Sequence, residues 1–318
     1  MIKLVEDRTV NGKELRKVFV DTVNDLMDEN KDVVILEADL GGASGSTATL
    51  KKHPDNFIQC GISEANMVEV ACGMSTLGYV PYIHTFAPFA TRRVYDQVYL
   101  SGAYAKNTIN IYGSDPGFTV GANGGTHTSF EDIALMRAMP EAIVCDAADE
   151  TQFEFILREF SKLKGVHYVR AGRKACRQLY DKSSQFELGK GVVVKEGKDV
   201  LIVSCGQIVS DALDAAEMLE AEGISVEVID MFTIKPLDKD LLVKEAAGKK
   251  AILTFENHSI INGLGSAVSE VIAEENINTH FKRVGVTDRF GQVGSPSFLQ
   301  KEFGLTAQDL YKAVKETL

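Results

Sequence analysis

Glu64 is the residue whose type and position point most directly to chemistry. It follows a short apolar strand (57–60), Gly61 and Ser63, and Ser63 stands at the expected N-cap of a helix. The helix is rich in small and apolar residues, so we expect most of its surface to be buried. A carboxylate in its first turn either complements the helix dipole at the surface or is a buried acid with a chemical role. Glu64 alone does not decide between these two interpretations.

Further polar and aromatic residues follow other predicted strands. Asp39 follows strand 32–38, Phe86 and Phe89 follow strand 80–85, and a Gly-rich loop that ends at His127 follows strand 107–112. Ligands of open α/β sheets bind at the carboxyl ends of the strands, so we expect these groups to meet. His127 is able to bind a substrate hydroxyl or phosphate, or to act as an acid or base. Packing of the two aromatic rings in the core and a surface position for the histidine are the alternatives.

Two arginines, Arg170 and Arg173, come directly after another predicted strand, 166–169. They are either surface charges or a clamp for an anion. The chain has no GxGxxG after a strand, no GxxxxGK[ST] and no GxSxG, so a nucleotide loop or a serine-hydrolase elbow is not indicated. It also has no HExxH and no cysteine and histidine pair at zinc spacing, and we expect no catalytic metal bound by this chain alone.

Strands and helices alternate along the chain, which predicts an α/β fold with mainly parallel sheets flanked by helices. The expected strands are 32–38, 57–60, 80–85, 107–112, 142–145, 166–169, 200–204, 225–229, 251–255 and 282–286, and the expected helices are 11–30, 64–78, 90–104, 130–138, 149–163, 208–222, 238–247, 263–275 and 306–318. Residues 171–190 lack periodicity. We therefore place a domain boundary near 187, which gives a first domain of 1–187 and a second of 188–318.

Composition is that of an ordinary globular protein, with 318 residues, 45% of them apolar and 25% charged. No apolar run approaches the ~20 residues of a membrane span, and the N-terminus lacks a signal-peptide pattern. The net charge of −11 argues against a nucleic-acid surface. The five cysteines are widely spaced and fit reduced core thiols, so we expect a cytoplasmic protein.

Together these features resemble the C-terminal half of a transketolase, which comprises a pyrimidine-binding domain and a C-terminal domain. The resemblance covers nearly the whole chain, and the shared order and spacing of its motifs make it specific. The motifs are Ala38-Asp39-Leu40, Gly61-Ile62-Ser63-Glu64, Thr85-Phe86 with Phe89, Thr119-Val120-Gly121 through Thr126-His127, 131–137, Val169-Arg170, Glu256-Asn257-His258, 263–268 and Asp288-Arg289-Phe290-Gly291. The resemblance implies a transferase that moves a two-carbon ketol unit from a ketose or ketose phosphate to an aldose, using thiamine diphosphate.

The resemblance also implies roles on the cofactor side of the site. Glu64 would hydrogen-bond to the aminopyrimidine ring and promote proton removal from the cofactor. The physical basis is that a carboxyl group in a mostly apolar pocket can share a proton with a ring nitrogen, with a pKa sensitive to burial. Phe86 and Phe89 would pack on the ring, and Asp39 would lie near the thiazolium.

On the substrate side, the resemblance assigns His127 to catalysis and to binding substrate oxygens together with Asn123. Arg170 and, less securely aligned, Arg16 would bind a sugar phosphate. The chain departs from the family pattern in several places: Arg92 replaces a third aromatic, Ala122 and Asn123 replace acidic residues, and Ala43 replaces a phosphate-binding serine for which Ser44 or Ser46 could substitute. The reaction class is unaffected by these changes. Those at Asn123 and Ala43 bear on the sugar-phosphate acceptor.

The family binds the diphosphate through Mg²⁺ and a Gly-Asp-Gly motif, and this chain contains no such motif. Oxygen ligands for the metal are therefore expected from another polypeptide. The prediction is a split enzyme in which this chain pairs with an N-terminal transketolase subunit. The family implies an α2β2 heterotetramer with active sites at subunit interfaces.

Other functions stay open at this point. The β subunit of a 2-oxo acid dehydrogenase would use the same Glu64, although the Thr126-His127 pair and the 131–137 stretch resemble transketolase more closely. A 1-deoxyxylulose-5-phosphate synthase normally carries both halves on one chain. A non-catalytic regulatory subunit with a relic site is the alternative from another class. The departures at Asn123 and Ala43 are compatible with it.

Overall fold

Six strands from the first half of the chain and one from the second form a seven-stranded sheet in the computed structural model, which describes residues 2–318. The strand order is β10-β5-β6-β4-β3-β1-β2. Neighbouring strands are parallel, except that β10 is antiparallel to β5. The strands are β1 (Val33–Glu37), β2 (Phe57–Gln59), β3 (Val80–Phe86), β4 (Ile109–Ser114), β5 (Ile143–Asp146), β6 (Val166–Ala171) and β10 (Thr233–Lys235). Strands β1, β4 and β6 are buried along their whole length, as expected when helices cover both faces of a parallel sheet.

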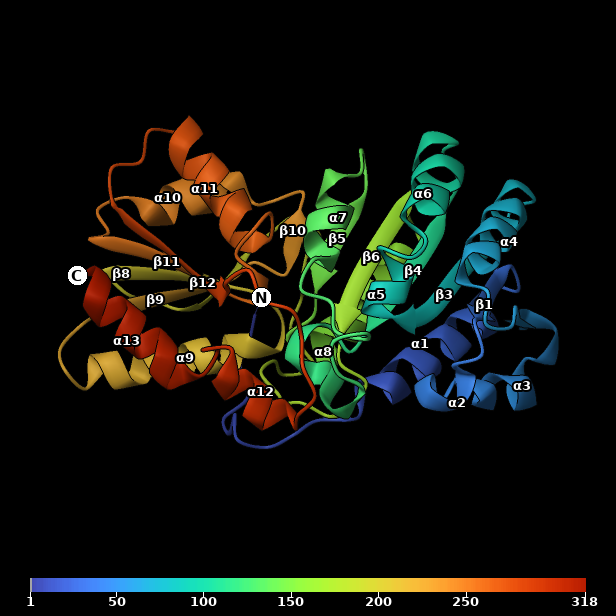
Figure 1. The fold of residues 1–318 in the computed structure, drawn as a ribbon, viewed down its shortest axis with the longest axis horizontal. Coiled ribbons are helices and arrows are strands. Elements are labelled where there is room, and N and C mark those ends of the chain that lie inside the picture. Colours follow the sequence, from blue (N-terminus) through green and yellow to red (C-terminus); the bar gives the residue numbers. More distant parts are fainter. Residues whose placement is uncertain (1) are drawn as a thin grey trace.

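Helices cover both faces of this sheet (Figure 1). Helices α1 (Leu15–Glu29) and α8 (Glu150–Phe160) lie side by side on one face, and α4 (Glu64–Thr76) and α7 (Asp132–Ala138) lie on the other. The shorter helical segments are α2 (Gly41–Ser44), α3 (Thr49–Lys52), α5 (Ala87–Ala90), α6 (Tyr95–Gln97), the π-helix η3 (Val98–Tyr104) and the 3-10 helices η1 (Ser46–Ala48), η2 (Pro54–Asn56) and η4 (Gly117–Asn123).

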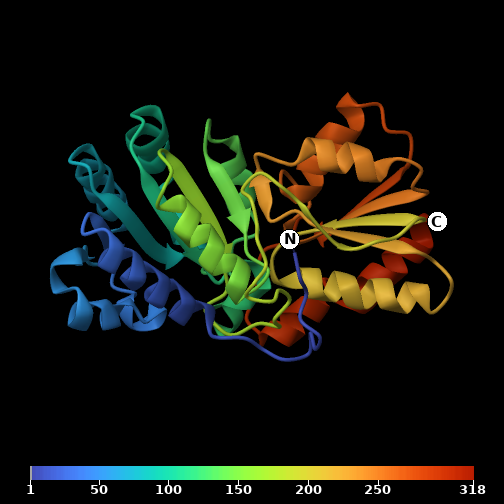
Figure 2. The ribbon, with the colours of Figure 1, turned by 180° about the vertical axis from the view of Figure 1, so that it is seen from behind.

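A five-stranded sheet with the order β12-β11-β8-β9-β7 forms the second half, and it is parallel except for β7. Its strands are β7 (Val192–Lys195), β8 (Val200–Ser204), β9 (Val226–Asp230), β11 (Ala251–Ser259) and β12 (His280–Val286). Helices α9 (Val209–Glu220) and α13 (Ala307–Thr317) cover one face and α10 (Lys239–Ala246) and α11 (Leu264–Glu274) the other, as Figure 2 shows from behind. The 3-10 helix η5 (Gly206–Ile208) precedes α9, and α12 (Pro296–Glu302) returns toward the first sheet.

The predicted fold class is confirmed, and several elements differ from expectation. Strands β7 and β10 and helix α12 were not expected, because each is too short to show a hydrophobic period. The expected helix 90–104 is instead divided into α5, α6 and η3, since the backbone leaves the helical region at Thr91. The expected helix 11–30 begins only at Leu15.

The two sheets are joined by more than a linker. Strand β10 lies between β9 and α10 in the chain, yet it extends the first sheet by pairing with β5. Another close approach occurs at Gly206, whose φ is +70°, because a Cβ there would lie 2.4 Å from a carboxylate oxygen of Asp146. A side chain at this position is therefore excluded both by conformation and by space.

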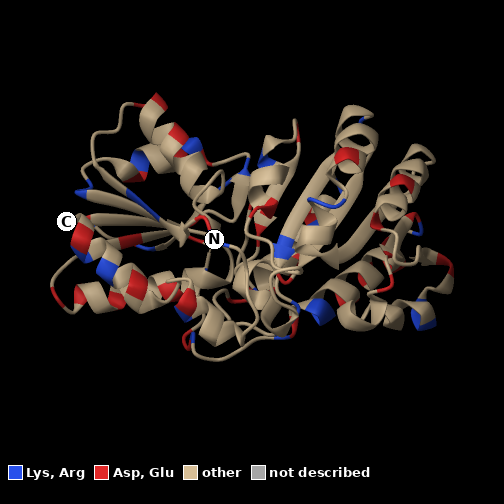
Figure 3. Ribbon diagram, in the orientation of Figure 1, with Lys and Arg blue, Asp and Glu red and all other residues tan. Residues whose placement is uncertain are grey.

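Charged residues lie mainly on helices and loops (Figure 3). The described cysteines are free thiols, three of them buried. No helix within residues 2–318 is long and apolar enough to cross a membrane.

Asp230, the last residue of β9, is a fully buried carboxylate. One of its oxygens accepts hydrogen bonds from the Tyr180 hydroxyl (2.6 Å) and the Gln152 amide (2.8 Å). Burial raises the pKa of Asp230 to about 7, against the lowering effect of these two donors. The folded protein thus holds a proton there that the unfolded chain, with a pKa near 3.9, releases at lower pH.

This proton makes stability depend on pH. A folded-state pKa above the unfolded one gives stability that is complete below pH ~4 and is lost as pH rises through 7. We expect Asp230→Asn, which keeps an oxygen acceptor but cannot ionise, to gain stability relative to the native protein as pH rises from 5 to 8, by at most about 1.4 kcal/mol per pH unit. Urea unfolding of both proteins across this range measures the difference. Exposed Asp21→Asn is the control, and parallel curves for Asp230→Asn and the native chain would show that Asp230 is already ionised.

Candidate active site

Glu64 is the first residue of α4, with Ser63 at the N-cap as expected, although the Ser63 hydroxyl caps no backbone N–H. Only 5% of Glu64 is exposed, which favours the buried acid over the surface residue. The prediction that most of the helix would be buried is wrong for this chain by itself. One face packs against β3, while Asn66 and Glu69 on the opposite side are exposed.

Three rings from two separate segments gather next to this helix start. Phe86 ends β3, Phe89 lies one turn later in α5, and His127 follows η4. Their ring centroids are 6.0 Å apart for the two phenylalanines, 5.4 Å for Phe86 and His127, and 5.1 Å for Phe89 and His127. All three contacts are edge-to-face, which is an arrangement that aromatic rings prefer.

Arg93 joins Glu64 to this cluster. Its guanidinium donates to a Glu64 carboxylate oxygen at 2.5 Å and lies 3.6 Å above the Phe89 ring. A guanidinium is a flat group with N–H donors along its edge, and it uses the edge for the carboxylate and the face for the ring. The space between Glu64 and Phe89 therefore accepts a planar nitrogen-containing group, so the residues fit an aminopyrimidine ring if Arg93 moves aside.

His127 is half-buried, and burial lowers its pKa below the ordinary value, with the positive charge of Arg93 lowering it further. The imidazole is therefore neutral near pH 7. Its Nδ1 lies 2.8 Å from the Thr126 hydroxyl, which leaves Nε2 for another partner. Arg92 contacts this loop: its guanidinium donates to the Thr126 carbonyl (3.3 Å) and to the Glu131 carboxylate (2.8 Å).

Asp39 lies in the turn just after β1, in a left-handed conformation with φ of +62°, and is exposed. Only a small fraction of non-glycine residues adopt this conformation, with Asp and Asn the most tolerant. Its N–H donates to the Gln59 side-chain oxygen (2.8 Å), which also accepts from the Gly61 N–H (3.0 Å). Gln59 therefore connects the Asp39 turn to the segment that leads into Glu64.

A buried polar network that sequence reasoning missed lies beneath this turn. Both Glu37 and His84 are essentially unexposed, and the His84 Nδ1 is 3.0 Å from a Glu37 carboxylate oxygen. The hydroxyls of Ser44 and Ser46 donate to that same oxygen at 2.6 Å each. The suggestion that either serine replaces the missing phosphate-binding serine at position 43 is therefore not supported, because both hydroxyls are buried and engaged.

Arg173 brings a cation to the other side of the aromatic cluster. Its guanidinium lies 4.7 Å from the Phe86 ring centroid, is 21% exposed and is paired with Asp115 at 2.6 Å. The backbone N–H of Arg16 donates to the Arg173 carbonyl (3.0 Å), so the start of α1 lies alongside. The Arg16 side chain is 37% exposed and pairs with Glu14.

Arg170 lies in surroundings that do not fit the expected phosphate-binding role, whereas Asn123 lies in the same loop as His127, as expected. The Arg170 guanidinium is fully buried, 2.8 Å from Asp132 and 3.1 Å from Asp146, and donates to the Asn257 carbonyl at 2.9 Å. Its charge is already balanced, and no part of it faces solvent. Asn123 is exposed at the end of η4, in the same loop as His127.

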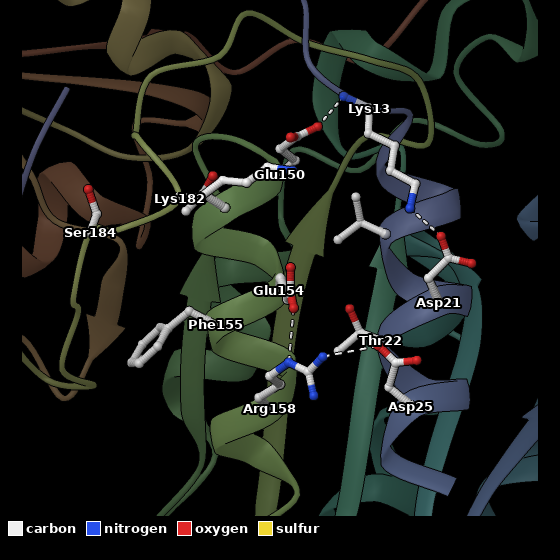
Figure 4. A pocket seen from close by; sticks show the side chains of 12 residues that line it. Lys13, Asp21, Thr22, Asp25, Glu150, Glu154, Phe155, Arg158, Lys182 and Ser184 are labelled. Atoms are coloured by element: carbon white, nitrogen blue, oxygen red, sulfur yellow. Dashed lines mark hydrogen bonds and ion pairs between the residues drawn. The ribbon is translucent and has the colours of Figure 1, made fainter. Parts of the chain in front are cut away.

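A separate cavity of about 620 Å³ lies between α1 and α8 (Figure 4). Lys13 pairs with Asp21 on one side of it, and Arg158 pairs with Asp25 at 3.2 Å and with Glu154 at 3.0 Å. None of its lining residues belongs to the aromatic cluster or to Glu64. Such paired surface charges are typical of solvated helix faces.

Comparison with known proteins agrees with this geometry. The family description "Transketolase, pyrimidine binding domain" matches residues 11–178, and "Transketolase, C-terminal domain" matches 189–310. The 6-deoxy-6-sulfo-D-fructose transketolase subunit SqwH of Clostridium sp. (strain MSTE9) is 39% identical over 95% of this chain and 94% of its own length. Human transketolase is 34% identical over 94% of this chain, but over only 48% of its own length. A solved structure of a split gene transketolase, described as an inactive β4 tetramer, has a TM-score of 0.88 and 39% identity, and the alignment covers 96% of this chain and 98% of that one.

The fold and these matches define one half of a thiamine-diphosphate-dependent enzyme of the transferase class. The chain belongs to the transketolase family and consists of its pyrimidine-binding and C-terminal domains. Ketol transfer is the reaction of that family, and the 2-oxo acid dehydrogenase alternative is not favoured.

Proposed function

We propose that this chain is the C-terminal subunit of a split transketolase that transfers a two-carbon ketol unit from a ketose to an aldose in carbohydrate metabolism of the pentose phosphate type. The N-terminal subunit would complete the enzyme, in an α2β2 assembly located in the cytoplasm. The observation that best supports this proposal is the share of each relative's length that this chain matches. The chain spans 94% of a relative that is itself a transketolase subunit and 48% of a single-chain transketolase.

Mg²⁺ and the diphosphate are assigned to the partner. Within residues 2–318, no three His, Cys, Asp or Glu side chains are arranged to hold a metal ion. Mg²⁺ takes oxygen ligands in near-ideal octahedral geometry, commonly one or two carboxylates plus phosphate oxygens. The partner would supply those carboxylates, and this chain would supply the surroundings of the pyrimidine.

Each residue of the aromatic cluster has a task in this proposal. When bound, thiamine diphosphate supplies the nucleophilic carbon that carries the ketol unit between sugars. Glu64 holds a proton shared with the aminopyrimidine nitrogen, and its burial suits a carboxyl group that gives and takes a proton. Phe86 and Phe89 hold the ring in place. Asp39, in the turn after β1, would lie near the thiazolium ring of the cofactor.

Substrate binding falls to His127, Asn123, Arg173 and Arg16. The neutral His127 donates or accepts a hydrogen bond at a sugar hydroxyl through Nε2. The Arg173 guanidinium lies 4.7 Å from the Phe86 ring centroid and is 21% exposed, which suits a phosphate or sulfonate at the far end of the sugar. Arg170, assigned to the phosphate by resemblance, is better explained as a structural cation because it is buried and paired.

The test is reconstitution. The chain is co-expressed with the product of the neighbouring open reading frame and supplied with thiamine diphosphate and Mg²⁺. Donors are ketose phosphates, a sulfonated ketose and unmodified ketoses, and acceptors are ribose 5-phosphate and simpler aldehydes. Ketol transfer that depends on both chains supports the proposal, and the donor profile separates phosphate from sulfonate. Cofactor binding without turnover on any sugar would favour a non-catalytic subunit.

Arg93 gives a further prediction, because it occupies the space proposed for the pyrimidine. Its partly buried ion pair with Glu64 and its contact with Phe89 must break before the ring enters, and such contacts contribute about 0.5–1 kcal/mol each. The two contacts together cost about 1–2 kcal/mol, so Arg93→Ala is expected to bind thiamine diphosphate roughly five- to thirtyfold more tightly in the complex, measured by calorimetric titration. Arg92→Ala is the matched control, since Arg92 pairs with Glu131 instead. Weaker cofactor binding by Arg93→Ala would mean that Arg93 helps to hold the cofactor.

A further inference from the structure

The loop that carries His127 is held at its base by a strand of the second sheet. Asn257 in β11 is 7% exposed, and its side-chain oxygen accepts from the Phe118 N–H at 3.1 Å. Its side-chain nitrogen donates to the Pro116 carbonyl at 3.2 Å. Gly117 lies between these two partners with φ of +58°, and a Cβ there would be 2.0 Å from the Asn257 side-chain oxygen. The turn therefore wraps closely around this amide.

The other end of the loop is fixed next to the same strand. The Gly117 N–H donates to the Ser129 carbonyl (2.9 Å), which closes the loop, and the Ser259 N–H donates to the Phe130 carbonyl (2.9 Å). Asn257 is itself held, because its carbonyl accepts from Arg170 at 2.9 Å. Both ends of the segment that presents His127 are thus connected to β11.

Between these ends the loop consists of the 3-10 helix η4 and a hydrogen-bonded turn that follows it. It contains three glycines, and the space beside each is bordered by the segment leading into α12. A Cβ at Gly121 would be 3.6 Å from Pro296, one at Gly124 would be 2.6 Å from Val293, and one at Gly125 would be 2.5 Å from the Gly291 carbonyl. Glycine restricts the backbone conformation little, so residues packed against the loop help to fix its course. Here those residues belong to the second half of the protein.

The base of the loop presents one N–H donor and one carbonyl acceptor, and the asparagine side chain has the length and the groups to bind both. This amide offers a donor and an acceptor at once, whereas a carboxylate only accepts and an apolar side chain does neither. With Asn257 replaced by alanine, the buried Phe118 N–H loses its acceptor, and the Pro116 carbonyl loses one donor while keeping those of Thr119. The loop is then free to shift relative to Phe86 and Phe89, which come from separate segments.

We propose that Asn257 is a positioning residue through which the C-terminal domain sets the place of His127 relative to the cofactor site. The inference rests on the proposed function, because it assumes that His127 contacts the sugar. Misplacing such a contact by about 1 Å is able to cost a hundredfold in rate. The C-terminal domain thereby acts on substrate binding without contacting substrate.

The test uses the reconstituted two-chain enzyme with Asn257→Ala and Asn257→Asp. Asn257→Ala is expected to raise the KM for the sugar about tenfold or more and to leave the thiamine diphosphate Kd within about twofold. Asn257→Asp keeps the acceptor for the Phe118 N–H and is expected to fall between the native enzyme and Asn257→Ala. Ser204→Ala is the control, since it removes another buried hydrogen bond, to the Phe255 carbonyl at 2.8 Å, away from the loop.

A double-mutant cycle separates positioning from general destabilisation. If Asn257 acts through His127, then Asn257→Ala adds nothing to the KM once His127→Ala is present. Additive effects, or a KM change no larger than that of Ser204→Ala, overturn the inference. If Asn257→Ala does not fold, the same cycle is run with Asn257→Asp. Absence of ketol transfer by the native and Ser204→Ala complexes would instead overturn the proposed function.

Discussion

Glu64→Ala is expected to lower ketol transfer by the two-chain enzyme at least about a hundredfold, the range that proton transfer by a positioned side chain contributes. Glu64 is almost fully buried at the start of α4, and within residues 2–318 its one ion pair is with a partly exposed arginine. Truncation removes the proton-sharing group without opening the core. Glu64→Gln, which keeps the size but cannot ionise, should be nearly as slow. Transfer to ribose 5-phosphate in the presence of thiamine diphosphate and Mg²⁺ measures the effect.

The control for Glu64 lies on the same helix. Glu69 is exposed and accepts a hydrogen bond from Ser101 at 3.0 Å, so Glu69→Gln alters the charge of α4 without touching the rings. Its rate should stay within about twofold of the native rate, as for most surface substitutions. A Glu64→Ala enzyme that transfers ketol units as fast as the Glu69→Gln enzyme would remove Glu64 from the mechanism. Retained cofactor binding without turnover would point to its role in proton transfer alone.

The regular alternation of apolar strands and helices made the fold class predictable, and the exceptions have physical causes. Strand β10 has only three residues and leaves its own half of the chain to pair with β5. A contact between distant segments of this kind leaves no local pattern. The region 90–104 reads as one helix by composition, yet Arg92 and Arg93 turn to reach Glu131 and Glu64. Tertiary ion pairs there outweigh local propensity.

Much the same holds for the site. Glu64, Phe86, Phe89 and His127 were predictable because each follows a strand, and the strands of a parallel sheet end at one edge. The position of Arg93 was not predictable from the sequence. Nothing in the sequence shows toward which side the arginine side chain points once the helix is interrupted. Arg170 lies near the end of β6 and Arg173 lies just beyond it, and alternation along a strand does not distinguish a buried cation from one past the strand end.

Arg170→Met is expected to destabilise the protein by about 3–5 kcal/mol, because removing one partner of a buried ion pair leaves the other without compensation. Asp132 and Asp146 would lose their shared cation, and the Asn257 carbonyl would lose a donor. Burial already raises the pKa of Asp146 to about 6, against the lowering effect of Arg170. Without the arginine the pKa rises further, so the folded variant takes up a proton. The destabilisation should therefore be smaller at pH 5 than at pH 8.

Arg173→Met is the matched comparison for Arg170→Met, since the two arginines are three residues apart and differ in burial. Arg173 is partly exposed beside Phe86, so its loss should raise the KM for phosphorylated or sulfonated sugars and change stability by about 1 kcal/mol or less. Urea unfolding and steady-state kinetics on both complexes separate the two roles. If Arg170→Met unfolds at the native urea concentration and instead loses affinity for anionic sugars, then Arg170 reaches the substrate in the assembled enzyme. Its pairing with Asp132 and Asp146 would then belong to the isolated chain alone.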